Sequence, residues 1–186
     1  MATAVAWTLF GLFGLVVLWI ILSYNALISL RNQVKNAWHQ IDVQLKRRYD
    51  LIPNLVEVVK DYMSFEQETL QKVIEARNVA LAAQGPKAQA EAEGMLTATL
   101  RSLFAVVENY PNLKASENVN RLQEELTSTE NKISFARQFY NDIVMHYNIK
   151  IQTVPTNLIA GFFRFMAEEF FEVPAMEKTA VKVDLR

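Results

Sequence analysis

The sequence predicts an all-α protein: an N-terminal transmembrane helix continues into an antiparallel four-helix bundle, followed by a short C-terminal amphipathic helix and a tail. Three observations predict this fold class. Residues 1–30 carry no charged side chain. Beyond residue 24, apolar residues recur at the helical spacings of three and four. Proline, glycine and asparagine interrupt that pattern at only a few points. We therefore divide the chain into an anchor (1–24), a helical bundle (25–155) and a Phe-rich segment with a tail (156–186).

The anchor is the apolar run from Val5 to Leu22. At about 1.5 Å per residue, this run and its uncharged flanks can cross a hydrocarbon layer of roughly 30 Å. Aromatic rings near both ends of the run are typical of the two membrane interfaces. The anchor residues that we expect in the membrane include Trp7, Phe10, Trp19, Ile20 and Tyr24.

A cleaved signal peptide is the competing interpretation of this segment. It requires a basic residue before the apolar run and a small-x-small site after it, and neither is present. We therefore predict an uncleaved anchor. Basic residues follow the run from Arg31 onward, and the positive-inside bias then places the bundle in the cytoplasm with a short N-terminus outside.

Four apolar stripes indicate the helices of the bundle, and the chain breaks between them. Asp50 can cap a helix beginning at Leu51, with Pro53 in its first turn. A kinked continuous helix is the alternative there, because no glycine lies between Lys46 and Val56. The further expected breaks are Gly85-Pro86, the region of Pro111 with Ser116 as a cap, and Pro155, which ends the fourth helix.

If the chain reverses its direction at each break, the segment after Pro155 returns to the bilayer surface. We expect Ile159, Phe162, Phe163, Met166 and Phe170 on one face of an amphipathic helix there. That face can meet lipid, a seam between subunits or the end of the bundle itself. The predicted interaction residues are Phe162, Phe163, Phe165, Phe170 and Phe171. Residues 180–185 alternate like a short strand that a second copy could pair, or they form a frayed tail.

Motifs for catalysis or metal binding are not found in the sequence. It has no cysteine, no Glu-x-x-His pair, no Gly-rich phosphate loop and a net charge of -1. The basic cluster Lys46–Arg48 is too small to indicate nucleic-acid binding. His39 and His146 each have an aspartate one helical turn away, which does not make a metal site. We predict no catalytic residue, no cofactor and no metal.

Several polar residues lie close to the apolar stripes and must pair if they are buried. We expect an inter-helix ion pair of Arg77 or Arg137 with Asp42 or Glu66, which would fix the choice of helix partner. The residues predicted for such pairing are Asp42, Arg48, Glu66, Arg77 and Arg137, and Asn148 is a further candidate.

Two blocks of sequence resemble a known family. They read YNALISLRNQVKNAWHQIDVQLKRRYDLIPNLVEVVKDYMSFEQETLQKVIEAR over 24–77 and ENKISFARQFYNDIVMHYNIKIQTVPTNLIAGFF over 130–163. Both are similar to the signatures of the LemA family, and with the anchor they cover most of the chain in the same order. The resemblance implies a single-pass bacterial inner-membrane protein with a cytoplasmic antiparallel four-helix bundle and no established enzymatic activity.

The functional hypothesis is therefore a non-enzymatic, homo-oligomeric scaffold or interaction module at the membrane. The alternative is a membrane-shaping or envelope-stress sensing bundle that uses the Phe-rich segment. An enzyme or metal-binding bundle is the third and least favoured hypothesis. We expect membrane lipid and further copies of the chain as partners, with other membrane proteins as candidates, and neither a nucleic acid nor a small-molecule substrate.

Overall fold

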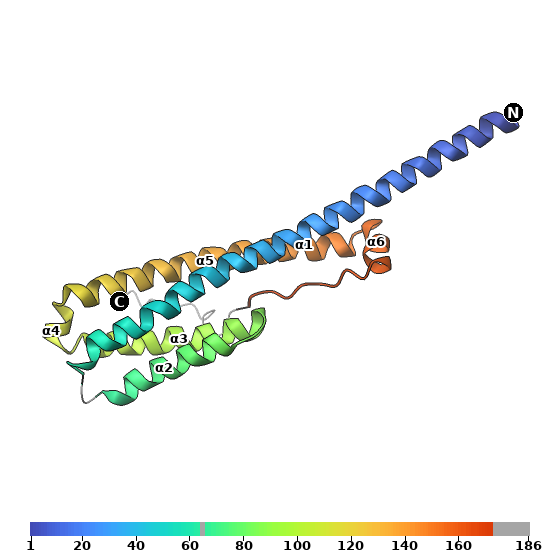
Figure 1. Ribbon diagram of the computed structural model, residues 1–186. Helices are drawn as coiled ribbons and strands as arrows, with labels where there is room; N and C mark the ends of the chain where they lie inside the picture. The colour runs from blue at the N-terminus through green and yellow to red at the C-terminus, as the bar shows by residue number, and fades with distance from the viewer. Residues whose placement is uncertain (64–65, 173–186) are drawn as a thin grey trace, which may run out of the picture. The chain divides into compact units, whose positions relative to one another are not determined.

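The computed structural model describes residues 1–63 and 66–172, and all regular secondary structure within them is helical (Figure 1). This confirms the predicted all-α class with one long apolar N-terminal helix. The six helices are α1 (Ala2–Lys60), α2 (Gln67–Ala82), α3 (Pro86–Val107), α4 (Pro111–Lys114), α5 (Glu117–Gln152) and α6 (Thr156–Phe162). The strand considered for residues 180–185 lies outside the described residues.

Helix α1 runs without a break through Asp50 and Pro53. The predicted helix start at Leu51 is therefore wrong, and the continuous helix is observed. Proline inside a helix has no N–H to donate to the carbonyl four residues earlier, which here belongs to Tyr49. Arg77 of α2 takes over this role, because its Nε donates a hydrogen bond to the Tyr49 carbonyl over 2.8 Å. A side chain from another helix thus compensates for the bond that Pro53 removes.

The later helix boundaries follow the residues that the sequence marks. Gly85 adopts a φ of 84°, a conformation that favours glycine, and Pro86 opens α3 at the position where a missing N–H costs little. Helix α5 begins directly after Ser116 and ends at Gln152, before Pro155. The breaks predicted at these points are confirmed.

The chain forms two compact units. The unit that contains the apolar stretch of α1, named the membrane-proximal unit for that reason alone, comprises residues 1–39 and 139–168, and its core joins Leu27 of α1 to Ile159 and Ala160 of α6. The distal unit comprises residues 40–138 and continues from 169. In the distal unit α2 and α3 pack along each other. Its fully buried side chains include Ile41, Ile52, Leu55, Val59, Leu96, Leu103 and Ile133.

The hydrogen bond from Arg77 to Tyr49 predicts a coupling between Arg77 and Pro53. We expect Arg77→Leu to lower the free energy of unfolding by about 1–3 kcal/mol, because a buried carbonyl loses its donor. In a Pro53→Ala background, the new N–H at residue 53 can serve the Tyr49 carbonyl, and Arg77→Leu should cost much less. Thermal unfolding of the full chain in detergent measures the four variants of this cycle.

Arg101→Leu, at an exposed position of α3, is the control for loss of a positive charge. If Arg77→Leu lowers the free energy of unfolding equally with proline and with alanine at residue 53, Arg77 does not compensate for Pro53.

Candidate functional site

The apolar part of α1 is exposed. Among the described residues, α1 contains the one stretch long and apolar enough to cross a membrane, and no part of that stretch is buried inside the protein. The exposed fractions of Trp7 and Phe10 are 75% and 71%. Near the end of this stretch, Trp19 and Ile20 become partly buried. A long run of bare apolar side chains is compatible with lipid as its surroundings.

Helix α6 packs against α1 where this apolar stretch ends. Leu27, Ile159 and Ala160 are buried together, and partly buried apolar side chains surround them. The Tyr24 ring lies 4.7 Å from the Phe163 ring and 5.8 Å from the Phe165 ring, between ring centroids. Tilted and edge-on aromatic pairs at these distances stabilise a contact beyond the area that they bury. Two of the predicted interaction residues, Phe163 and Phe165, thus contact a predicted anchor residue.

The end of α6 differs from the prediction. The helix stops at Phe162, and Arg164 follows with a φ of 56°. The Phe165 N–H donates to the Ala160 carbonyl and the Arg164 N–H to the Gly161 carbonyl, which is the hydrogen-bond pattern of a Schellman cap. Residues 163–170 therefore do not continue the predicted amphipathic helix.

The single apolar face predicted for this segment is wrong, because α6 packs on α1 and the chain leaves the helix after Phe162. Ile159 is buried against α1, whereas Phe162 points away from that contact with 81% of its side chain exposed. Met166 lies past the helix end and is 79% exposed. The exposed apolar residues consequently come from one side of α6 and from the turn that follows it.

Hydrogen bonds from α5 hold the segment after α6 in place. The Tyr147 hydroxyl donates to the Met166 carbonyl over 3.0 Å. Asn148 donates to the Glu168 carbonyl over 2.9 Å and accepts the Glu168 N–H over 3.0 Å. Burial, with the nearby charge of Glu168 adding to it, raises the pKa of the Tyr147 hydroxyl, which therefore remains a donor. Asn148 thus pairs, as expected of a polar residue near the core.

The last two predicted phenylalanines belong to the distal unit. Phe171 is almost fully buried, and the Arg137 guanidinium carbon lies 5.7 Å from the centre of its ring. A cation over an aromatic face is attracted by the ring quadrupole. Phe170 is 38% exposed. Phe171 is thus part of the core, which leaves it unavailable to a partner or to lipid.

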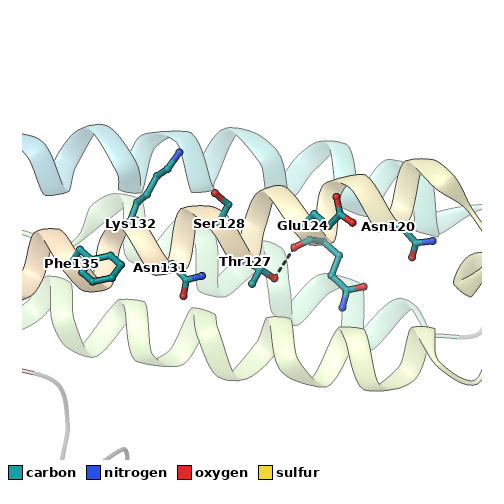
Figure 2. A pocket seen from close by; sticks show the side chains of 8 residues that line it. Asn120, Glu124, Thr127, Ser128, Asn131, Lys132 and Phe135 are labelled. Carbon is teal, nitrogen blue, oxygen red and sulfur yellow. Dashed lines mark hydrogen bonds between the residues drawn. The ribbon is translucent and has the colours of Figure 1, made fainter.

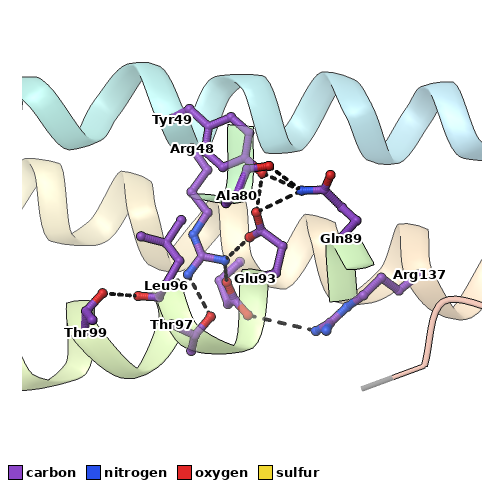
Figure 3. A network of polar contacts seen from close by, with 10 residues as sticks. Arg48, Tyr49, Ala80, Gln89, Glu93, Leu96, Thr97, Thr99 and Arg137 are labelled. Atoms are coloured by element: carbon purple, nitrogen blue, oxygen red, sulfur yellow. Dashed lines mark hydrogen bonds and ion pairs between the residues drawn. The ribbon is translucent and has the colours of Figure 1, made fainter. Parts of the chain in front are cut away.

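A network of buried charges lies inside the distal unit (Figure 3). Arg48 of α1 contacts Glu93 of α3 over 2.8 Å and Glu130 of α5 over 2.7 Å. Its guanidinium also donates to the Thr97 hydroxyl over 2.8 Å. The side chains of Arg48 and Glu93 are only 4% and 3% exposed. One buried guanidinium therefore joins three helices, while the Glu130 side chain is 36% exposed.

Tyr49 and Gln89 extend this network. The Tyr49 hydroxyl donates to Glu93 in a short hydrogen bond, and Gln89 Nε2 donates to the Tyr49 hydroxyl over 2.8 Å and to the Ala80 carbonyl over 3.1 Å. Burial raises the pKa of the Tyr49 hydroxyl, and the charge of Glu93 adds to the rise. Burial likewise raises the pKa of the Glu93 carboxyl, while the charge of Arg48 opposes the rise. Tyr49 is consequently a neutral donor at physiological pH.

The structure gives partners for several of the polar residues that the sequence predicts to pair. Arg77 bonds the Tyr49 carbonyl, and an Nη atom of Arg137 lies 3.9 Å from Glu130. Glu66 precedes α2, where its carbonyl accepts the N–H groups of Thr69 and Leu70. Asp42 lies on α1 and also takes part in an interaction. Arg48, placed among the pairing residues from sequence, is the centre of the observed network.

Sequence reasoning missed Glu93 and Gln89, although a signal was present. Six of the eight buried positions of α3 are spaced alternately by four and three residues, and both polar residues lie on this stripe: Gln89, Glu93, Leu96, Leu100, Leu103 and Val107. Extending the predicted apolar stripe backward from Leu96 therefore leads to Glu93. A carboxylate at a core position requires a buried cation, and Arg48 occupies a core position between Leu45 and Ile52.

A shallow polar groove of about 780 Å³ lies along α5 in the distal unit (Figure 2). Its lining includes Phe135, which is 73% exposed, and the charged residues Glu124 and Lys132. Thr127 donates its hydroxyl to the Gln123 carbonyl, four residues back in the same helix. These groups can form hydrogen bonds with a partner, but they do not include a nucleophile paired with a base.

Within residues 1–63 and 66–172 there is no group of three or more His, Asp or Glu side chains that could hold a metal ion.

The fold and these sites define a class of protein: an all-helical chain in which one N-terminal helix can cross a membrane and a buried polar network lies between helices. The LemA family model matches residues 37–185, and the chain belongs to the LemA family.

Curated relatives agree with this assignment. The chain is similar to Protein LemA of Metamycoplasma hominis, with 27% identity over 161 residues that cover 84% of this chain and 72% of the relative. It is also similar to magnetosome protein MamQ of Magnetospirillum gryphiswaldense, with 23% identity over 183 residues that cover 84% of this chain and 67% of the relative. Magnetosome protein MamQ 2 of Paramagnetospirillum magneticum is 23% identical over 179 residues, 82% of this chain and 66% of the relative. These names indicate no catalytic family.

The two hydrogen bonds of Asn148 lead to a prediction for the membrane-proximal unit. Asn148→Ala removes both bonds to the Glu168 backbone, and we expect it to lower the free energy of unfolding by about 1–2 kcal/mol. The Glu168 amide should then exchange its hydrogen faster. Hydrogen exchange read by mass spectrometry checks this, with Asn131→Ala at an exposed position of α5 as the matched control. Unchanged exchange at residues 164–168 would contradict the role of Asn148.

The buried Arg48 leads to a second prediction. Arg48→Met should destabilise the protein by about 3–5 kcal/mol, because it leaves Glu93 as an uncompensated buried charge. The neighbouring Arg47→Met removes an exposed contact to Glu125 of 3.8 Å and should cost less than about 1 kcal/mol. Adding Glu93→Gln to Arg48→Met should restore part of the loss.

The pH dependence of the Arg48→Met effect follows from the raised pKa of Glu93. The folded state holds the Glu93 proton more tightly than the unfolded state, so protonation of Glu93 favours folding. This contribution is present below the ordinary carboxyl value of 4.5 and is lost as the pH rises through the folded pKa. Arg48→Met should therefore cost more at about pH 7.5 than at about pH 4. Melting curves at both pH values test this, and a larger cost at the lower pH would refute the assignment.

Proposed function

We propose that this LemA-family protein is a non-enzymatic, single-pass membrane scaffold that acts as a homo-oligomer. One observation carries the proposal. The single helix α1 contains the exposed apolar stretch and also buried side chains that contact α2, α3 and α5. The same helix thus has a part that is compatible with lipid and a part that organises a water-soluble helical domain.

The arrangement that we propose for this domain is an antiparallel four-helix bundle. Short connections of the chain between α2 and α3 and between α3 and α5 favour reversal of direction at each step. The contact of α6 with Tyr24 supports it further, because the chain must return toward the anchor for these residues to meet. The Arg48 guanidinium supports it as well, because it joins α1 to Glu93 of α3 and Glu130 of α5.

We further propose that the anchor lies in the bacterial inner membrane with the bundle in the cytoplasm. Arg31, Lys35 and Lys46 follow the apolar stretch, and the positive-inside bias places such residues on the cytoplasmic side. Lipid and further copies of the chain are the proposed partners, and other membrane proteins are candidates for what the scaffold organises.

The exposed face of α5 supports self-association. It combines the 73%-exposed ring of Phe135 with the amide and hydroxyl groups of the groove, a mixture that is suited to a protein contact. Self-association through this face would cover Phe135 and leave the buried charge network untouched.

Cysteine cross-linking in native membranes tests the scaffold, because the chain has no cysteine of its own. We expect Ser128→Cys, in the groove of α5, to form a covalent dimer under mild oxidation. Glu91→Cys, at an exposed position of α3, is the control and should react less. A membrane-impermeant maleimide should label Ser128→Cys only after the cells are opened. A full-length particle of one chain in lipid nanodiscs, with no cross-link at either position, would overturn the proposal.

A further inference from the structure

Large apolar side chains are exposed on α6 and on the residues around it. The exposed fractions are 74% for Val154, 70% for Leu158, 81% for Phe162 and 79% for Met166. The opposite side of α6 is already occupied, because Ile159 and Ala160 are buried against Leu27 of α1. The exposed set therefore does not serve as a cover for the core of its own unit.

The position of α6 along α1 indicates what this surface meets. The α6 cluster contacts α1 from Trp19 to Leu27, a distance of about 12 Å along the helix axis at about 1.5 Å per residue. This range covers the end of the apolar stretch and the first residues beyond it. If the stretch lies in the hydrocarbon layer, this part of α1 lies in the boundary between acyl chains and headgroups.

The chemistry of the segment fits that boundary. Residues 151–166 contain no acidic side chain, and Arg164 is their single charged residue. Arg164 is exposed and lies directly after the ring pair of Phe162 and Phe163, whose centroids are 5.0 Å apart. Phenylalanine and methionine can enter the acyl boundary while a guanidinium stays at the phosphates.

The first acidic residue that follows, Glu168, contacts other helices. The backbone of Glu168 is held by Asn148, and its carboxylate lies 4.0 Å from Arg31. The acidic residue nearest to the segment is thus held by contacts with α5 and α1. The segment from Val154 to Met166 is left as an apolar surface with one cation.

We propose that α6 and residues 163–166 form a lipid-binding surface that lies in the membrane interface beside the anchor. Leu158, Phe162 and Met166 enter the acyl-chain boundary, and Arg164 contacts lipid phosphates. A lipid surface is favoured over a second copy of the chain because α6 packs on α1 at Trp19, Ile20 and Tyr24, beside the exposed apolar stretch. The inference rests on the membrane anchor of the proposed function and adds a second point of contact to it.

Single-cysteine spin labels on the full-length chain test this surface. The protein is placed in vesicles of phosphatidylcholine and phosphatidylglycerol, with labels at Phe162→Cys and Met166→Cys. Collisions with oxygen, which concentrates in lipid, are compared with collisions with a water-soluble nickel chelate. Glu91→Cys is the aqueous control, and Gly11→Cys is the control within the anchor, where an added Cβ meets nothing within 4 Å.

We expect collisions with the nickel chelate at residues 162 and 166 to fall several-fold below those at residue 91, with oxygen collisions close to those at residue 11. Nickel collisions at 162 and 166 equal to those at 91, with residue 11 in lipid, would overturn this inference alone. Low collisions with both reagents at 162 and 166 would also overturn it, since they indicate a protein contact. A water-accessible residue 11 would overturn the anchor, and with it the proposed function.

Discussion

Arg48 places a full positive charge among buried residues, and this burial is tolerable because two carboxylates from two other helices lie within 2.8 Å of its guanidinium. The remaining polar groups of the distal unit follow from that pairing. Glu93 needs further donors once it is buried, and Tyr49 supplies one. Gln89 then links Tyr49 to the carbonyl of Ala80 in α2. The Arg48 charge thus restricts which helices can be neighbours and in which register, since a shifted helix would leave a buried charge alone.

Tyr49 also connects this network to the path of α1. Its hydroxyl belongs to the buried cluster, while its carbonyl is the one that Pro53 leaves without a helical donor. Arg77 donates to that carbonyl from α2. The proline is therefore accommodated in an unbroken helix by a contact that exists only when α2 is in place. The unbroken path of α1 and the packing of α2 against it therefore depend on the same hydrogen bond.

The membrane-proximal unit is organised by apolar packing and by backbone hydrogen bonds in place of buried charges. The Tyr24 ring contacts two phenylalanine rings of the segment that follows Pro155. Tyr147 and Asn148 bind the backbone of the same segment from α5. These contacts bring an exposed apolar surface next to the anchor, which is the feature from which the lipid contact is inferred. The scaffold function depends on the anchor, whereas the lipid-binding surface is an addition to it.

The sequence by itself determined the helical class, the apolar N-terminal helix, the breaks at Gly85-Pro86 and before Pro155, and the family. Each of these depends on local chemistry: side-chain periodicity, the φ of glycine, the missing N–H of proline, or the absence of charge. Tertiary structure alone decided three further points. The break predicted at Asp50 is absent because Arg77 replaces the lost hydrogen bond. Phe162 is exposed because α6 packs on α1 through Ile159 and Ala160, whereas Phe171 is buried beside Arg137. Glu93 pairs with Arg48, 45 residues away, because a buried charge takes its partner from the helix that packs beside it. The spacing of residues along one helix does not specify which helix that is.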